Sequence, residues 1–176
     1  MTGLRRGTVK LVAYNSKWVD LFDKESRLLS RHFGKTIFKI EHVGSTAIRG
    51  IPAKPIIDID VAVKSLRVAR MMNAKFTKLG YAKRPKPGRP WEVLYVKGLP
   101  EKRTHYVHVI PWQSIRGRDD VMFRNFLRLN KSRATQYADL KRKLAKKYSL
   151  NRDKYTRAKS AFIKKTLVLA KENTSQ

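Results

Sequence analysis

The sequence predicts an α+β fold, in which a small mixed β-sheet is followed by a layer of helices. Two patterns indicate this architecture: β-branched runs typical of strands occur in the first two thirds, and from Asp119 onward apolar residues recur at helical spacing. The length of 176 residues suits one folding unit better than two. We therefore expect a single domain over 1–176, with a sheet-containing core at about 8–112 and a helical part at about 119–171.

The first half of the chain is expected to alternate strands and helices. Clusters of β-branched residues predict strands at 9–14, 37–42 and 56–63. The last of these runs is almost entirely apolar, which is typical of a strand buried on both faces. Amphipathic spacing predicts a helix from Ser16 to Gly34 and another from Ser65 to Gly80.

The second half is expected to complete the sheet and then to become helical. Residues 92–96 and 104–110 predict two strands joined by a Gly-Leu-Pro turn, and therefore a hairpin added to the sheet. A basic loop rich in Pro and Gly, at 83–90, precedes them and is a candidate contact arm. The helical part is expected to be divided and capped at Asn130, Ser132 and Asn151.

The charge of the chain is strongly positive. There are 41 Lys and Arg residues against 13 Asp and Glu residues, which gives a formal net charge of +28. Such a surface attracts polyanions, and nucleic acid is the partner that we expect, with RNA favoured; an anionic membrane or a mere surface bias are the alternatives. No apolar run is long enough to cross a bilayer and no signal peptide is evident, so we expect a cytoplasmic protein without a membrane partner. The absence of Cys excludes disulfides and thiol nucleophiles.

A glycine-serine turn and a pair of aspartates carry the strongest chemical signal. Gly44, Ser45 and Thr46 follow a predicted strand, where glycine lets the backbone approach a ligand and the hydroxyl and N–H groups suit phosphate oxygens. Asp58 and Asp60 alternate along the next strand, so their carboxylates point to the same face. Two like charges on an apolar strand are costly unless a cation relieves their repulsion, and we expect Mg²⁺ or Mn²⁺ there.

Taken singly, each feature also has an ordinary explanation. The glycine-serine sequence can be a simple tight turn, and the aspartates can form ion pairs with nearby Lys or Arg. Arg49 and Lys54 lie between the two features and are expected to neutralise further phosphate charge. Together, the two features point to a nucleotide-binding site.

The spacing of these two features resembles that of the polymerase-beta-like nucleotidyltransferase superfamily. Within it, the run from His42 to Ala47, followed by Gly50, by 53–55 and by 57–58, is similar to the GrpB family, also called UPF0157. The likeness extends along nearly the whole chain. It implies a nucleotidyltransferase-like fold without a settled reaction. As the enzyme function we expect metal-dependent transfer of a nucleoside monophosphate from a nucleoside triphosphate to an acceptor hydroxyl; an RNA end suits the charge best, and a small molecule or a protein side chain is the alternative acceptor.

One departure from the superfamily concerns the third carboxylate, which a later strand usually supplies. The corresponding strand here carries His105 and His108 in place of an acid, and Glu92 is an alternative third acid. Imidazole serves as a metal ligand or as a general base, so His108 is predicted to complete a catalytic and metal site with Asp58 and Asp60. Hydrogen-bonded sheet histidines without a catalytic role are the alternative.

The remaining predicted contacts are to nucleotide and to nucleic acid. His42 is expected to orient a phosphate. Nucleotide contacts are also predicted from the helical part, at Lys141, Tyr155 and Lys159, against the alternative of a packed or solvated helix face. Nucleic-acid contacts are predicted at Lys83, Arg84, Lys86, Arg89, Arg124, Arg128, Lys131, Arg133, Arg142, Lys143, Lys146 and Lys147. The alternative function is a non-catalytic, RNA-binding or ribosome-associated protein on the same fold.

Overall fold

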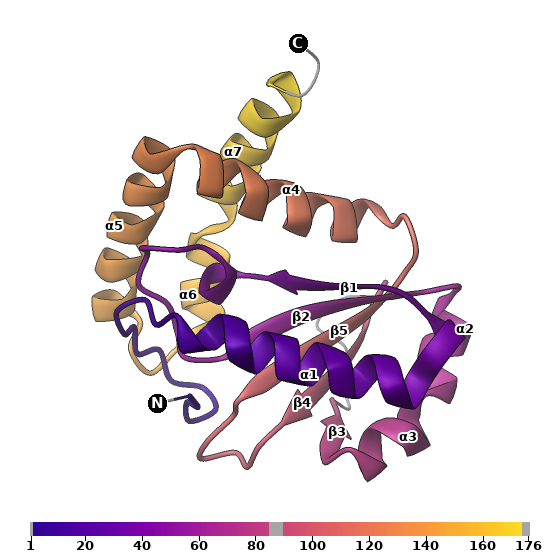
Figure 1. Cartoon of the computed structure of the whole chain (residues 1–176). Coiled ribbons are helices and arrows are strands. Elements are labelled where there is room, and N and C mark those ends of the chain that lie inside the picture. The colour runs from indigo at the N-terminus through magenta and orange to yellow at the C-terminus, as the bar shows by residue number, and fades with distance from the viewer. Residues whose placement is uncertain (1, 85–89, 174–176) are drawn as a thin grey trace.

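The computed structural model describes residues 2–84 and 90–173, and these residues form a mixed α+β structure (Figure 1). The strands are β1 (Ile37–Val43), β2 (Ile57–Val63), β3 (Tyr81–Lys83), β4 (Val93–Lys97) and β5 (His105–Pro111). The helices are α1 (Lys17–Phe33), η1 (Gly34–Thr36), η2 (Ser45–Ala47), α2 (Leu66–Met71), α3 (Asn73–Lys78), α4 (Ile115–Leu129), α5 (Lys131–Lys147), α6 (Arg152–Ala158) and α7 (Ser160–Glu172). No helix in these two ranges has the length and hydropathy that a bilayer crossing requires.

The strands form one mixed sheet in the order β1-β2-β5-β4-β3. Strands β2 and β5 are parallel, whereas the other neighbours are antiparallel, so the predicted mixed sheet and the β4–β5 hairpin are confirmed. The central position of β2 explains why its sequence is apolar on both sides of its two aspartates.

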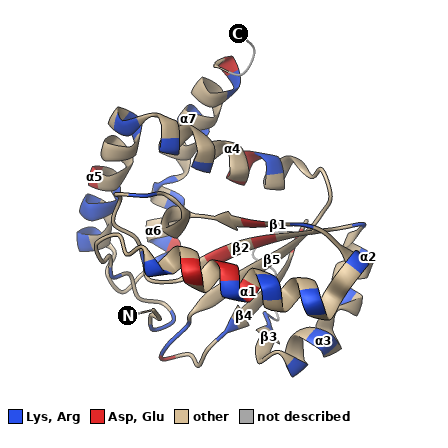
Figure 2. Cartoon of the chain, in the orientation of Figure 1, with Lys and Arg blue, Asp and Glu red and all other residues tan. Residues whose placement is uncertain are grey.

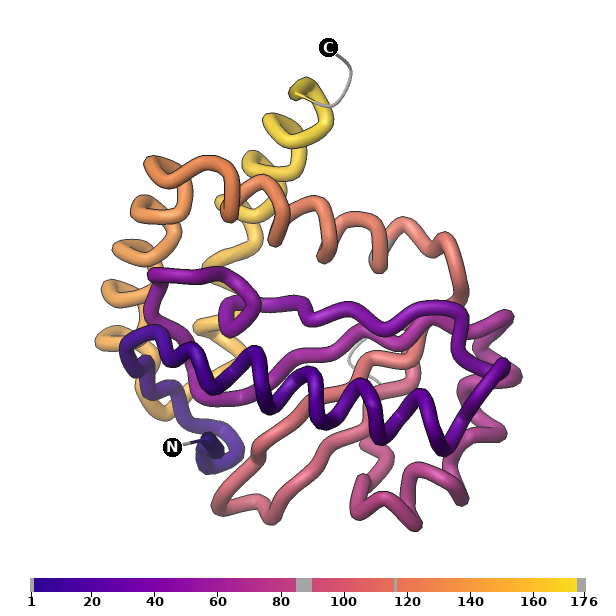
Figure 3. The backbone as a smooth tube through the Cα atoms, in the orientation of Figure 1, coloured from indigo at the N-terminus to yellow at the C-terminus, as the bar shows by residue number. Residues whose placement is uncertain are grey.

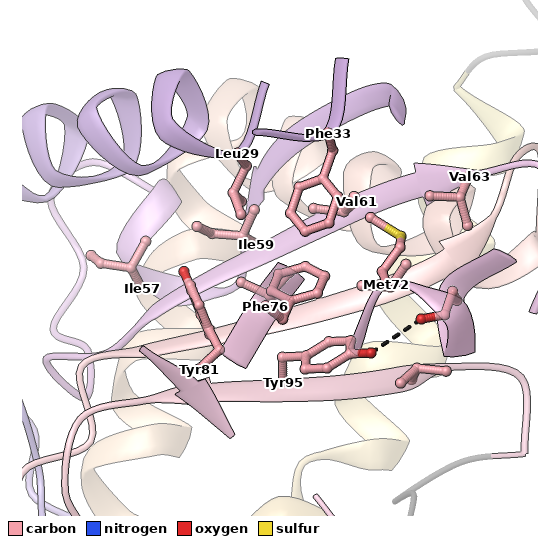
Figure 4. Packing of buried hydrophobic residues seen from close by; sticks show 14 of the residues in the cluster. Leu29, Phe33, Ile57, Ile59, Val61, Val63, Met72, Phe76, Tyr81 and Tyr95 are labelled. Atoms are coloured by element: carbon pink, nitrogen blue, oxygen red, sulfur yellow. Dashed lines mark hydrogen bonds between the residues drawn. The ribbon is translucent and has the colours of Figure 1, made fainter. Parts of the chain in front are cut away.

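One face of the sheet is covered by α1, α2 and α3. The odd-numbered residues of β2, from Ile57 to Val63, are fully buried there. They meet Leu29 from α1 and Phe76 from α3, whose ring is stacked on Tyr95 of β4 with a centroid distance of 3.9 Å (Figure 4). Each buried apolar side chain of this size contributes about 1.5–3 kcal/mol, so this face supplies much of the folding free energy.

The other face carries the even-numbered residues of β2 and lies toward the C-terminal helices. Tracing the backbone shows the β1–β2 connection running alongside α5 (Figure 3). Two side chains of that connection, Ile48 and Ile51, pack into a second apolar cluster with Leu127 of α4 and Tyr137 of α5. The helical layer therefore holds the connection that contains the glycine-serine turn.

Two of the expected elements in the first half of the chain differ in the structure. The expected strand at 9–14 is an extended segment with a single bridge, between Val12 and Ala53, because it runs along a loop that offers no continuous strand partner. The helix expected from Ser65 to Gly80 is two short helices separated at Met72, although Ser65 does cap the first by accepting a hydrogen bond from Val68 N–H.

The helical part begins at Ile115 rather than Asp119. The side chain of Ser114 caps α4 by accepting a hydrogen bond from the Gly117 N–H, a capping signal that the apolar spacing did not reveal. Asn130 and Asn151 cap α5 and α6 as predicted, whereas Ser132 lies inside the first turn of α5.

Candidate functional site

The glycine-serine turn lies against the first aspartate of β2. Gly44 has φ +70°, and a Cβ on it would lie 2.7 Å from Oδ2 of Asp58. Only glycine therefore allows both this backbone conformation and this close approach. Burial raises the pKa of Tyr137 of α5 to about 12 and the nearby Ser45 side chain acts to lower it, so the turn, the sheet and the helical layer meet at one point.

His42 and Thr46 are buried beneath this turn and bind each other. His42 Nε2 lies 3.0 Å from Thr46 Oγ1, which donates in turn to the carbonyl of Ile56 at 3.4 Å. The His42 ring also stacks on Phe22 of α1, with a centroid distance of 4.7 Å. Burial lowers the pKa of His42 to about 4 despite the nearby Asp58 carboxylate, so the ring is neutral and supports the turn from below.

A chain of polar contacts runs from Asp58 through His108 to Glu92. His108 Nδ1 is 2.9 Å from Glu92 Oε2, and its Nε2 is 3.9 Å from Asp58 Oδ1. Burial alone would lower the pKa of His108, but the two carboxylates, with Asp60 close by, raise it to about 10. His108 is therefore an imidazolium at neutral pH, and Glu92, a buried residue directly before β4, is the carboxylate that pairs with its Nδ1.

Three lysines form a cluster on the side of the helical layer, and two of them, Lys54 and Lys159, interact with the charge of Asp58. They are Lys54 from the β1–β2 connection, Lys141 from α5 and Lys159 from the end of α6. The amines of Lys54 and Lys159 lie over the ring of Tyr155, at 5.7 and 4.5 Å from its centroid. The amine of Lys141, a residue only 1% exposed, donates to the carbonyl of Pro52.

Burial and mutual repulsion lower the pKa values of all three amines. Desolvation is the largest cause in each case, and the neighbouring cationic side chains add to it. The pKa falls to about 7 for Lys54, about 6 for Lys141 and about 8 for Lys159. The pKa of Asp58 is lowered as well: burial raises it, but His108, Lys54 and Arg152 outweigh that effect, so the carboxylate stays ionised.

The aspartates suit a hard divalent cation only in part. Asp58 and Asp60 alternate along β2 with buried apolar residues, so they lie on the same face of the sheet. Asp58 is partly exposed and Asp60 is 4% exposed. Within 2–84 and 90–173, however, no three His, Asp or Glu side chains are grouped closely enough to hold a metal ion by themselves. A cation at Asp58 and Asp60 would therefore need further oxygen ligands, such as water or substrate phosphate, which is the coordination that Mg²⁺ prefers. The Mg²⁺ or Mn²⁺ site stays a prediction.

Beside Asp60, the sheet and α4 enclose a mostly apolar cavity of about 180 Å³. Ile110, Trp112 and Val121 line it, together with polar groups that include Glu41. The cavity continues the same face of the sheet past the two aspartates. It can accept a flat, partly apolar group.

The residues predicted to contact nucleic acid fall into two groups. Arg124 donates to the Glu41 carboxylate at 2.7 Å, and Arg128 donates twice to the carbonyl of Ala47, so both brace the site from α4. Arg133 lies over the Phe162 ring, and Arg142 pairs with Asp139. The exposed members are Arg128, Lys83, Lys131, Arg142, Lys143, Lys146 and Lys147.

Of the basic loop, Arg84 is half-buried, while Lys86 and Arg89 lie outside the described residues. Figure 2 shows Lys and Arg along the helices, α5 prominently, whereas α1, β1 and β2 carry Asp and Glu. Arg49 is exposed on the β1–β2 connection. Tyr81, at the start of the short strand that precedes this loop, is buried and donates to Glu25 at 2.8 Å.

Two residues of the site were not predicted as such. Arg152 lies at the start of α6, and its positive charge acts to lower the pKa values of Asp58, Lys54 and Lys159. Tyr137 reaches Ser45 from α5. Neither is marked by a local motif, because each is brought to the turn only by the packing of the helical layer.

Known proteins of one family match this chain over nearly its whole length. Residues 8–168 match the family model described as GrpB protein. The chain is 35% identical to the "Glutamate-rich protein GrpB" of Alkalihalophilus pseudofirmus, over 95% of this chain and 98% of that protein. It is 33% identical to UPF0157 protein YqkA of Bacillus subtilis, over 89% of this chain and 45% of that protein. A crystal structure of conserved protein GrpB from Enterococcus faecalis superposes with a TM-score of 0.85 at 33% identity, covering 95% of this chain and 100% of the other.

Proposed function

We propose that this chain, which belongs to the GrpB family, binds the phosphates of a nucleoside triphosphate at the lysine cluster and transfers the nucleoside monophosphate to an acceptor hydroxyl. The observation that carries the proposal is the cluster of Lys54, Lys141 and Lys159, two of which interact with the charge of Asp58. Burial is the main cause of their lowered pKa values and the charges of neighbouring cations add to it, and a bound polyphosphate would stabilise the protonated amines.

In this proposal the triphosphate lies between the glycine-serine turn and α6. The Ser45 hydroxyl and the amines of Lys54 and Lys159 would contact its phosphates. His42 and Thr46 hold the turn in place from below and do not need to touch the ligand. The apolar cavity beside Asp60 offers a place for the nucleobase.

Asp58 and Asp60 would hold a divalent cation, which would polarise the phosphoryl oxygens and stabilise the leaving pyrophosphate. The acceptor oxygen would attack the α-phosphorus, the bond from that phosphorus to the bridging oxygen would break, and the acceptor proton would pass to solvent or a nearby base. His108 carries a proton when paired with Asp58 and Glu92. We therefore assign it to orienting Asp58, rather than to the general-base role that the sequence predicted.

A second function is non-catalytic binding of a nucleotide or of RNA by the same scaffold. The observation that favours it is the pairing of Asp58 with His108, which engages a carboxylate that a metal would need. The two functions differ in one result, because a binder would hold the triphosphate without releasing pyrophosphate.

Nucleotide binding is tested by calorimetry with each nucleoside triphosphate, with and without Mg²⁺ or Mn²⁺. Lys159→Met removes one amine from the cluster while keeping the side-chain volume, and we expect roughly tenfold weaker binding, equivalent to about 1.4 kcal/mol. Lys24→Met, on the exposed surface of α1, is the matched control and should bind normally. Equal affinities in the two variants, or no binding in the parent, would remove the lysine cluster from the proposal.

Transfer is tested with triphosphate labelled at the α-phosphate, total RNA as the candidate acceptor and nuclease-treated protein. We expect label to move to RNA with release of pyrophosphate, and Asp58→Asn to abolish this transfer because the cation loses a ligand. Triphosphate binding without transfer in any acceptor pool would favour the non-catalytic function.

The affinity should also depend on pH. Phosphate binding favours protonated amines, so the affinity is expected to fall as pH rises above about 8, the pKa of free Lys159. Lys159→Arg keeps its charge at high pH and should retain more of its affinity there. Parallel pH profiles for the parent and this variant would argue against a phosphate contact by Lys159.

A further inference from the structure

A basic pocket lies away from the glycine-serine turn. It is formed at the place where the N-terminal segment, β3, β4 and the start of α6 come together. Its volume is about 250 Å³. Five basic residues line it: Arg6, Lys83, Arg84, Arg103 and Arg152. None of the described residues that line it is acidic.

The arginines of this pocket are held by elements that are distant in sequence. Arg152 lies over the Tyr106 ring, 4.7 Å from its centroid, and Arg103 donates to the carbonyl of Gly98. The backbone N–H of Arg103 donates to the carbonyl of Leu4, and that of Arg84 donates to Leu94. The fold thus gathers like charges into one concave place, which costs free energy that an anionic ligand would offset.

Phosphate is the anion that this arrangement suits best. The guanidinium fork donates two parallel hydrogen bonds to a phosphate, and four of the five basic residues are arginines. The one aromatic ring of the described lining, that of Tyr106, is covered by Arg152 and is closed to base stacking. Recognition there would therefore depend on phosphates and not on base sequence.

We propose that this pocket is a second phosphate-binding site, which takes a backbone phosphate of single-stranded RNA or a free oligophosphate. The site goes beyond the proposed function, since it requires neither the aspartates nor transfer. Only Arg152 is common to both sites, through its charge effect on Lys54. The variants that test the second site therefore avoid Arg152.

The test compares Arg6→Gln/Arg84→Gln with Lys24→Gln/Arg27→Gln, which removes the same charge from the exposed side of α1 on the opposite face of the sheet. Two ligands are used across a salt series: a short single-stranded RNA of mixed sequence and inorganic tripolyphosphate. For RNA, the slope of log affinity against log salt should fall by about 0.7 in the pocket variant, the value for one lost phosphate contact in a single strand. The control should show a much smaller change.

Weaker RNA binding alone identifies a backbone site, and weaker tripolyphosphate binding alone identifies an oligophosphate site; either supports the proposal. Equal effects of the pocket and control variants on both ligands would overturn it. Nucleoside triphosphate binding that depends on Lys159 should stay unchanged in the pocket variant, so failure of the second site is distinguished from failure of the first. Arg6→Glu, compared with Lys24→Glu, repeats the test at an exposed residue where unfolding is not expected.

Discussion

Gly44 shows how a single missing Cβ allows two elements to meet. Gly44→Ala would force a side chain into a left-handed conformation and against the Asp58 carboxylate, 2.7 Å away. We expect a loss of about 2–4 kcal/mol in the free energy of unfolding, measured by urea denaturation. Gly50→Ala is the control, because Gly50 has φ +82° with no atom within 4 Å of the added Cβ. The Gly50→Ala variant should lose only about 1 kcal/mol in the free energy of unfolding. Equal losses would show that contact with Asp58 is unimportant.

The raised pKa of His108 predicts that the free energy of unfolding depends on pH. Its folded pKa, about 10, lies above the unfolded value of about 6.5, so its contribution is fully present below about pH 6.5 and is lost as pH rises toward 10. His108→Asn should cost roughly 3 kcal/mol at low pH by breaking a buried charge pair, and less near pH 10. Denaturation of both proteins across this range checks the difference. A constant difference would contradict the protonated state, and His32→Asn, an exposed position, is the control.

At the scale of elements, α4 and α5 hold the glycine-serine turn in position through one side chain each. Arg128 of α4 fixes the carbonyl of Ala47, and Tyr137 of α5 reaches Ser45. The Asn130 side chain accepts a hydrogen bond from the Arg133 N–H at 2.9 Å and so starts α5 directly after α4. The turn that would bind phosphate is therefore supported by two helices as well as by the sheet.

The cap at the start of α5 gives a prediction for the element. Asn130→Ala should lower the free energy of unfolding by ~1 kcal/mol, because an N–H of the first turn loses its acceptor. Ser16→Ala is the comparison, since the Ser16 side chain makes no capping hydrogen bond at the start of α1. Its effect should stay within about 0.5 kcal/mol. The free energy of unfolding of the two variants is measured by thermal or urea denaturation. Equal losses in the two variants would mean that the Asn130 hydrogen bond does not stabilise α5.

For the whole molecule, charge is the dominant property. The net charge of +28 predicts RNA binding through phosphates, with affinity falling as salt rises. Lys143→Gln/Lys146→Gln/Lys147→Gln removes three exposed charges from α5 and should reduce the salt slope by roughly 2, at ~0.7 per contact. A parent slope near zero would contradict nucleic-acid binding altogether. A relative named glutamate-rich is 35% identical to this chain, whereas this chain has 13 Asp and Glu among 176 residues, so the fold does not require an acidic surface.

The sequence alone was sufficient for the fold class, the β4–β5 hairpin and the GrpB family, and these predictions are confirmed. It also identified Gly44, Asp58 and Asp60 as neighbours, because strand periodicity and a glycine turn are local properties that a run of residues expresses directly. The edge strand β3 was missed, since three residues form a strand there only through pairing with β4.

The tertiary structure decided which charges belong to the candidate site. Arg124 resembles a surface contact in the sequence, yet it is buried and its guanidinium group binds Glu41, whereas the exposed Arg128 donates to the Ala47 carbonyl. Lys54, Lys141 and Lys159 are separated along the chain but form one cluster, where burial lowers their pKa values. Sequence patterns report which face of an element is apolar, but the desolvation and the mutual charge that set a pKa arise only when distant elements pack together.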